Sequence, residues 1–129
     1  MLKINQIHHI AIICSDYEIS KRFYTDVLGF EVKQEVFREA RNSWKLDLKV
    51  AGKYQIELFS FPGPAPRPSR PEAAGLRHLA FEVDDLEAAI LFLSAKNVQT
   101  EPIRVDEFTG KRFTFFADPD GLPLELYER

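Results

Sequence analysis

The chain has little cysteine, no long apolar run and no excess of positive charge. Cys14 is its single cysteine among 129 residues, which excludes an internal disulfide and a zinc site built from several thiolates. No apolar run approaches the roughly 20 residues that a membrane-spanning helix needs. The formal net charge is −3, which argues against nucleic acid and anionic membranes as partners. Together with a start that does not resemble a signal peptide, these features predict a cytoplasmic protein.

Two segments of the chain share one design. Residues 76–85 read LRHLAFEVDD, which predicts a strand with His78 on the face opposite Leu79, followed by a helix start. The segment from His9 reads HIAIICSD and has the same features 69 residues earlier. Glu57 and Glu125, each between aliphatic residues, recur at an offset of 68. The chain therefore reads as a doubled unit that contributes one histidine and one glutamate per copy.

The hydrophobic pattern predicts the order β-α-β-β-β twice. Strands are expected at 6–14, 30–37, 44–50 and 54–61, and again at 76–83, 98–100, 112–116 and 122–127. Helices are expected at about 16–28, with Ile19, Phe23 and Val27 facing inward, and at about 85–96. Five of the eight prolines fall within 62–71, which predicts a stiff linker over 62–75. The predicted fold is α+β, a single domain over 1–129 with modules at about 6–61 and 76–129 and mostly antiparallel, curved sheets.

Four side chains of this repeat could form a metal site. His9, Glu57, His78 and Glu125 each stand among apolar neighbours, where a carboxylate without a partner is costly. Two imidazoles and two carboxylates around one divalent ion would remove that cost, and the mixed donors suit Zn, Ni, Co, Fe or Mn. A lone histidine or glutamate in a strand can also be an ordinary core or surface residue. The matched offsets favour the metal site.

The sequence resembles the vicinal oxygen chelate superfamily, also called the glyoxalase, bleomycin-resistance and dioxygenase family. The matching features span the chain: His9-Ile-Ala-Ile, Phe23-Tyr24 with Leu28-Gly29-Phe30, Ile56-Glu57-Leu58, His78-Leu-Ala-Phe, and Asp118-Pro-Asp-Gly with Leu124-Glu125-Leu126. The resemblance implies paired β-α-β-β-β modules that form a cup around one divalent metal ion, and commonly a homodimer. It also implies that His9, Glu57, His78 and Glu125 are the metal ligands, a set that is similar to that of glyoxalase I.

The resemblance implies a metal-dependent lyase or isomerase that works through a metal-bound enediolate. Glu125, or Glu57 opposite it, would then be the catalytic base, and the substrate would be a small molecule with vicinal oxygens. Ile13 and Phe61 stand where glyoxalase I has an arginine and an asparagine that contact glutathione. We therefore expect a substrate other than the adduct of glutathione and methylglyoxal.

Several cationic residues could bind a charged substrate in place of that arginine and asparagine. The candidates for binding a carboxylate or phosphate are Arg38, Arg41, Lys45, Arg67, Arg70 and Arg112, with Trp44 as a possible platform. Solvated surface charge is the alternative for each cation. A core position is the alternative for Trp44, since it alternates with Leu46 and Leu48.

Other functions of the superfamily stay open on the sequence alone. An epimerase of acyl thioesters, a thiol transferase and an iron-dependent ring-cleaving dioxygenase are alternative enzymes. A non-catalytic protein that binds an aromatic antibiotic is a further alternative. Because relatives of that last kind generally lack the metal residues, the presence of all four ligand types favours an enzyme.

Overall fold

A computed structural model describes residues 1–129 and divides into two compact units, Met1–Pro66 and Arg67–Arg129. Each unit contains a four-stranded mixed sheet and a short α-helix that follows its first strand. The order β-α-β-β-β thus occurs twice, as the sequence predicts. No helix has both the length and the hydrophobicity of a membrane span.

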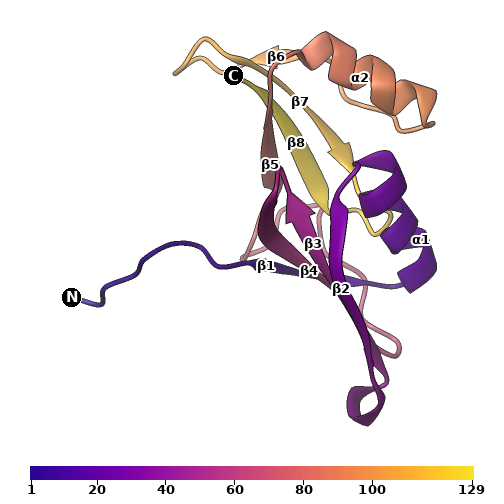
Figure 1. Ribbon diagram of the computed structural model, residues 1–129. Helices are drawn as coiled ribbons and strands as arrows, with labels where there is room; N and C mark the ends of the chain where they lie inside the picture. Colours follow the sequence, from indigo (N-terminus) through magenta and orange to yellow (C-terminus); the bar gives the residue numbers. More distant parts are fainter. The chain divides into compact units, whose positions relative to one another are not determined.

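The first unit is built on the strands β1 (Ile10–Cys14), β2 (Glu31–Arg38), β3 (Ser43–Val50) and β4 (Lys53–Ser60). Their order in the sheet is β1-β4-β3-β2, with β1 parallel to β4 and the other neighbours antiparallel (Figure 1). The helix α1 (Tyr17–Arg22) continues as a π-helical turn, Phe23–Val27, and a 3₁₀ turn, Glu39–Arg41, joins β2 to β3.

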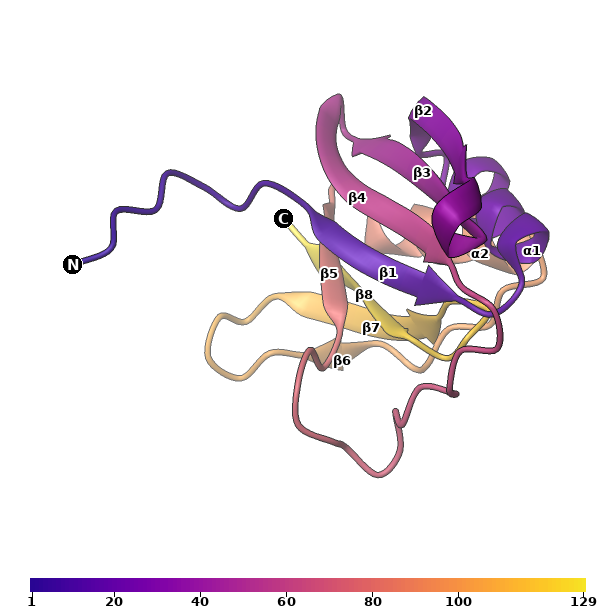
Figure 2. The ribbon, with the colours of Figure 1, turned by 90° about the horizontal axis from the view of Figure 1, so that it is seen from below.

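The second unit repeats this topology. Its strands β5 (Leu79–Val83), β6 (Arg104–Val105), β7 (Arg112–Ala117) and β8 (Pro123–Glu128) lie in the order β5-β8-β7-β6, with β5 parallel to β8. The helix α2 spans Leu86–Ala95. Residues 61–78, which contain the proline-rich stretch, form a long loop with no helix or strand (Figure 2).

An aspartate begins each α-helix. The side chains of Asp16 and Asp85 accept hydrogen bonds from the backbone N–H groups of Ile19 and Ala88, at 3.2 and 2.9 Å. Because the first amides of a helix have no partner within the helix, these caps fix the point at which each strand gives way to its helix.

The core of each unit lies on one face of its sheet. In the first unit the buried residues of the two central strands include Leu46, Leu48, Ile56 and Leu58, which are at most 1% exposed. In the second unit Leu124 and Leu126 of β8 take the equivalent positions. Successive side chains of a strand alternate between faces, so Lys45, Asp47, Glu57 and Glu125 point away from these cores.

Five sequence predictions were wrong in detail. The strand expected at 76–83 begins only at Leu79, so His78 precedes it. The first strand begins at Ile10 instead of residue 6, and residues 1–9 are exposed and outside any strand. The first helix is α-helical only to Arg22, and Ile19 is 48% exposed while Tyr17 and Ser20 are buried. The strand expected at 98–100 is absent, because the Val98 amide donates to the Leu93 carbonyl and closes α2. The corresponding strand is β6, at Arg104–Val105.

A charged network joins α1 to β2 and leads to a testable pH dependence. The Glu35 carboxylate accepts hydrogen bonds from the Lys21 ammonium at 2.7 Å and from the Tyr17 hydroxyl at 2.5 Å. These two bonds hold the pKa of Glu35 below its usual value. A lowered carboxyl pKa contributes stability above the unfolded pKa that is lost as the pH falls through the folded pKa.

We therefore expect wild type to be more stable than Glu35→Gln above about pH 5, and this difference to vanish in stronger acid. Urea unfolding of both proteins between neutral and acidic pH measures the difference. Glu31→Gln is the matched control, since Glu31 is an exposed residue of the same strand. A difference that does not change with pH would show that the charge of Glu35 has no part in it.

Candidate functional site

The first unit brings His9 and Glu57 together. His9 immediately precedes β1, and Glu57 lies in β4 opposite Ala11. The His9 Nε2 and Glu57 Oε2 atoms are 3.0 Å apart, and the Glu57 residue is only 6% exposed. On its other side, the Nδ1 atom of His9 lies 2.8 Å from that of His8.

Glu57 also shares a cation with a second buried carboxylate. Asp47 of β3 lies directly opposite Glu57 in the antiparallel pair, so both carboxylates point to the same face of the sheet. The Lys45 Nζ atom is 2.7 Å from Asp47 Oδ1 and 3.3 Å from Glu57 Oε1. Burial by itself would lower the pKa of Lys45, but the hydrogen bonds and charges of the two carboxylates outweigh it and raise that pKa. Lys45 is thus a fixed positive charge beside Glu57.

Tyr54 belongs to the same cluster. Burial, followed by hydrogen bonds to Glu57 and Asp47, raises the pKa of its hydroxyl. The hydroxyl therefore stays protonated at neutral pH as a donor to these carboxylates. Sequence reasoning missed Asp47 and Tyr54. The alternation of Lys45 and Asp47 with Leu46 and Leu48 was the available signal for Asp47.

The second unit holds the equivalent pair, His78 and Glu125. Their Nε2 and Oε2 atoms are 4.0 Å apart, and Glu125 lies in β8 opposite Ala80. The antiparallel neighbour of Glu125 is Phe115, whose ring also meets the His78 ring edge to face at 5.0 Å. An aromatic residue thus stands where the first unit has Asp47, and Glu125 has no lysine partner.

Each unit supplies one imidazole and one carboxylate, and neither groups three or more potential metal ligands by itself. These donor types fit the divalent metals predicted from the sequence. Two ligands in neighbouring positions around one such ion lie roughly 3 Å apart, given bond lengths of about 2.0–2.2 Å. The separation of His9 and Glu57 is compatible with such an arrangement, and equally with a hydrogen bond.

Three of the predicted substrate residues lie on the Glu57 face of the first unit. Lys45 is one, as described. The guanidinium of Arg38 stacks over the rings of Phe59 and Phe61, and that of Arg41 over Phe61. Trp44 lies on the opposite face, where its ring stacks on Tyr17 of α1 with 5.2 Å between centroids. Trp44 is therefore packed between helix and sheet.

The other three candidates lie at different places in the second unit; they are Arg67, Arg70 and Arg112. Arg67 donates to the backbone carbonyls of Leu76 and Arg77, just before His78. Arg112 bonds to Glu128 and to Glu87 of α2 on the helix side of the sheet, and so joins helix to sheet. Arg104, which sequence reasoning missed, lies over the rings of Phe113 and Phe115.

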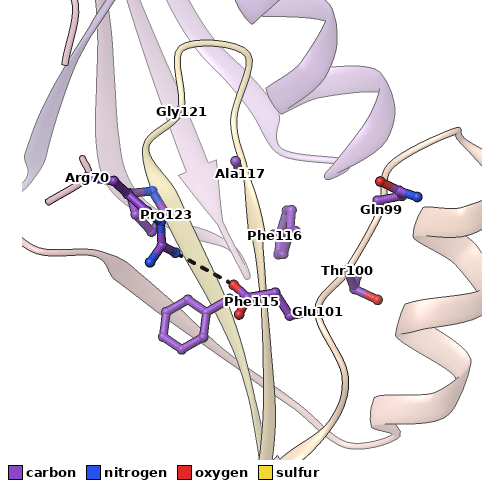
Figure 3. A pocket seen from close by; sticks show the side chains of 9 residues that line it. All are labelled: Arg70, Gln99, Thr100, Glu101, Phe115, Phe116, Ala117, Gly121 and Pro123. Carbon is purple, nitrogen blue, oxygen red and sulfur yellow. Dashed lines mark ion pairs between the residues drawn. The ribbon is translucent and has the colours of Figure 1, made fainter. Parts of the chain in front are cut away.

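Arg70 borders a cavity of about 300 Å³ in the second unit (Figure 3). Its guanidinium lies 3.9 Å from the carboxylate of Glu101, which also lines this cavity. Phe115, whose ring meets that of His78, is also one of the residues that line the cavity. Glu101 is shared, because its other carboxylate oxygen lies 3.6 Å from the Arg104 guanidinium, so one carboxylate faces two arginines there.

The sequence matches the Glyoxalase/Bleomycin resistance protein/Dioxygenase superfamily over residues 6–126. It is 66% identical to the uncharacterized protein YaeR of Escherichia coli (strain K12), with full coverage of both chains. It is 30% identical to a 2-epi-5-epi-valiolone epimerase from Actinomyces sp., covering 93% of this chain and 77% of the relative. The crystal structure of a glyoxalase family protein from Enterococcus faecalis superposes with a TM-score of 0.89 at 54% identity, covering 95% and 97% of the two chains. The chain therefore belongs to the Glyoxalase/Bleomycin resistance protein/Dioxygenase superfamily.

Proposed function

We propose that His9, Glu57, His78 and Glu125 together bind one divalent metal ion, and that the protein is a glyoxalase I-like lyase or isomerase. Its substrate is a small molecule with vicinal oxygens, and the reaction moves a proton between adjacent carbons. One observation carries this proposal: each unit holds a histidine–glutamate pair at the same register, on the sheet face away from its core. Superfamily membership supports it.

The two carboxylates have different surroundings, which suggests different roles. Lys45 and Tyr54 hold Glu57 in place and balance its charge, as befits a ligand. Glu125 lies beside Phe115 and has only His78 as an ionic partner, so it is the freer acceptor for a substrate proton. The bound cation would stabilise the negative charge that develops on the substrate oxygens. Glu125 would take the proton from one carbon and return it to the next.

The substrate is proposed to differ from the adduct of glutathione and methylglyoxal. Ile13 lies opposite Phe59 on the Glu57 face and is 55% exposed, and Phe61 lies under two guanidinium groups. Neither apolar side chain can donate a hydrogen bond to a glutathione carboxylate or amide.

A second candidate function is an epimerase, which the valiolone epimerase relative supports. An epimerase removes the same kind of proton, next to a carbonyl, but returns it to the same carbon. The two functions therefore share their first step. They differ in whether the carbonyl moves along the substrate.

Metal binding gives the first test. Protein stripped with EDTA and titrated calorimetrically with Ni, Zn, Co, Fe(II) and Mn is expected to bind one ion per chain. His9→Ala and His78→Ala should each lose more than the roughly 10- to 100-fold in affinity typical of an outer-shell partner. His8→Ala, the adjacent histidine, should lose less. Two ions per chain, or no loss in both variants, would contradict a single shared centre.

Exchange of substrate hydrogen with solvent tests the proposed proton transfer, and it can be measured although the reaction product is not known. Hydroxyketones, hemithioacetals and acyl thioesters incubated in D₂O with the metal-loaded protein should exchange the hydrogen next to the carbonyl, as followed by NMR. Movement of the carbonyl identifies an isomerase, and inversion without movement an epimerase. Absence of exchange across all three classes would contradict both.

A further inference from the structure

Two arginines on the Glu57 face have no acidic partner. Arg38 is half-buried at the end of β2, and Arg41 is exposed in the 3₁₀ turn that follows. Although the chain is net negative, neither guanidinium forms an ion pair. The remaining acidic contacts of the chain involve other cations. Two positive charges are therefore left unbalanced within a few residues of each other.

Each of these guanidinium groups lies over one or two aromatic rings. The Arg38 Cζ atom is 4.8 Å from the Phe59 ring centroid and 5.7 Å from that of Phe61, and the Arg41 Cζ atom is 5.7 Å from Phe61. A ring beneath a guanidinium interacts with its charge and does not use up its N–H groups. Arg38 uses one of them on the Ser43 hydroxyl at 2.9 Å, while its Nε atom is buried without a partner.

These arginines lie on the same face as Glu57. Arg38 pairs with Ser43 in the β2–β3 ladder. Ser43 is two residues from Lys45, which pairs with Phe59 in the β3–β4 ladder. The side chains of Arg38, Ser43, Lys45 and Phe59 therefore point to the same side of the sheet as Glu57. Phe59 is two residues from Glu57, which is roughly 7 Å along a strand. An acid group bound at Arg38 would thus lie a few bonds from a reacting centre at Glu57.

A stacked arginine in the second unit provides a contrast. The Arg104 guanidinium lies over Phe113 and Phe115 at 5.1 and 5.5 Å, but it pairs with Glu101 at 3.6 Å. A guanidinium over two rings therefore has an acidic partner in one unit and none in the other. An open pair of stacked guanidinium groups is the arrangement that recognises carboxylates and phosphates.

We propose that Arg38 and Arg41, supported by Phe59 and Phe61, form an anion subsite for a carboxylate or phosphate group at the far end of the substrate. The subsite's existence follows from the geometry of the first unit, while its link to a reacting end at Glu57 rests on the proposed function. The substrate class is then a small acid with its vicinal oxygens a few bonds from the acid group. The two guanidinium groups would hold that acid group, which the apolar side chains of Ile13 and Phe61 cannot do.

Titration of the metal-free, full-length protein with inorganic phosphate and with malonate, followed by ¹H–¹⁵N NMR, tests the subsite. Both probes are expected to shift amides of residues 38–43 and 59–61, and the tighter probe identifies the acid group. The Arg38→Gln, Arg41→Gln double variant should bind at least ~10-fold more weakly, as expected for loss of charge-assisted hydrogen bonds. Arg22→Gln removes the same charge at an exposed position of α1, and this variant should bind both anions as wild type does.

Arg41→Gln alone keeps the test valid if the double variant does not fold, because Arg41 is exposed. Unchanged anion affinity in the folded variants, or no binding of either probe by wild type, would overturn the subsite. Metal is removed with EDTA, and the EDTA is dialysed away before the titration because it is a polycarboxylate. The outcome is therefore independent of the metal titration. If the protein binds metal but neither anion, the proposed function stands and the subsite does not. If it binds an anion but no metal, only the subsite stands.

Discussion

A Glu125→Gln variant is expected to exchange substrate hydrogen about 10²–10⁴-fold more slowly than wild type at saturating metal, the usual contribution of a positioned base. Glutamine keeps the size and the carbonyl oxygen of the side chain, but its amide does not accept a proton near neutral pH. NMR in D₂O with a substrate identified by the exchange screen measures the rate. Metal occupancy is measured in the same samples, so that lost chemistry is separated from lost metal.

Glu82→Gln is the matched control for this experiment. Glu82 lies on the same face of the second unit, opposite Tyr127 of β8, and is exposed without an ion pair. Its loss changes the net charge equally and should leave the exchange rate unchanged. If Glu57→Gln abolishes exchange with metal bound while Glu125→Gln does not, the base is Glu57 and the role assigned to Glu125 is wrong.

The repeat made the architecture predictable from the sequence. Period-two alternation around His9 and His78, followed each time by an aspartate cap, identifies the first strand and helix of both modules. Hydrophobic alternation likewise locates β3, β4, β7 and β8, because one face of each carries the core. The short β6 escaped prediction, since two exposed residues leave no alternation to detect.

The surroundings of the site depended on strand register, which a single sequence does not reveal. The ladders shift between Val32 and Gln34 and between Leu48 and Lys49. The shift in the β3–β4 ladder decides which residues of β4 stand beside Lys45 and Asp47, while the shift in the β2–β3 ladder lies beyond Asp47 and changes only the pairs of Glu31 and Val32. Sequence spacing likewise could not distinguish Arg38, on the Glu57 face, from Arg112, on the helix side, because both are arginines at a strand end.

Replacing Lys45 with methionine is expected to destabilise the metal-free protein by roughly 1–3 kcal/mol. Asp47 and Glu57, each 6% exposed, would face each other without the ammonium that now lies within 3.3 Å of both. Removing one partner of a fully buried ion pair typically costs about 3–5 kcal/mol. The expected loss is smaller here because the Lys45 side chain is 29% exposed and solvent screens part of its charge. Urea unfolding in EDTA measures it.

Two further variants show whether charge is the cause. Lys49→Met removes a lysine from the same strand that has no ion pair, and should have little effect. Adding Asp47→Asn to Lys45→Met removes one of the two opposed carboxylates and should restore most of the lost stability. Under the proposed function a divalent cation at Glu57 takes over the role of the ammonium, so metal should stabilise Lys45→Met more than wild type. Equal stabilisation by metal would mean that the cation does not bind beside Lys45, and would remove Glu57 from the ligand set.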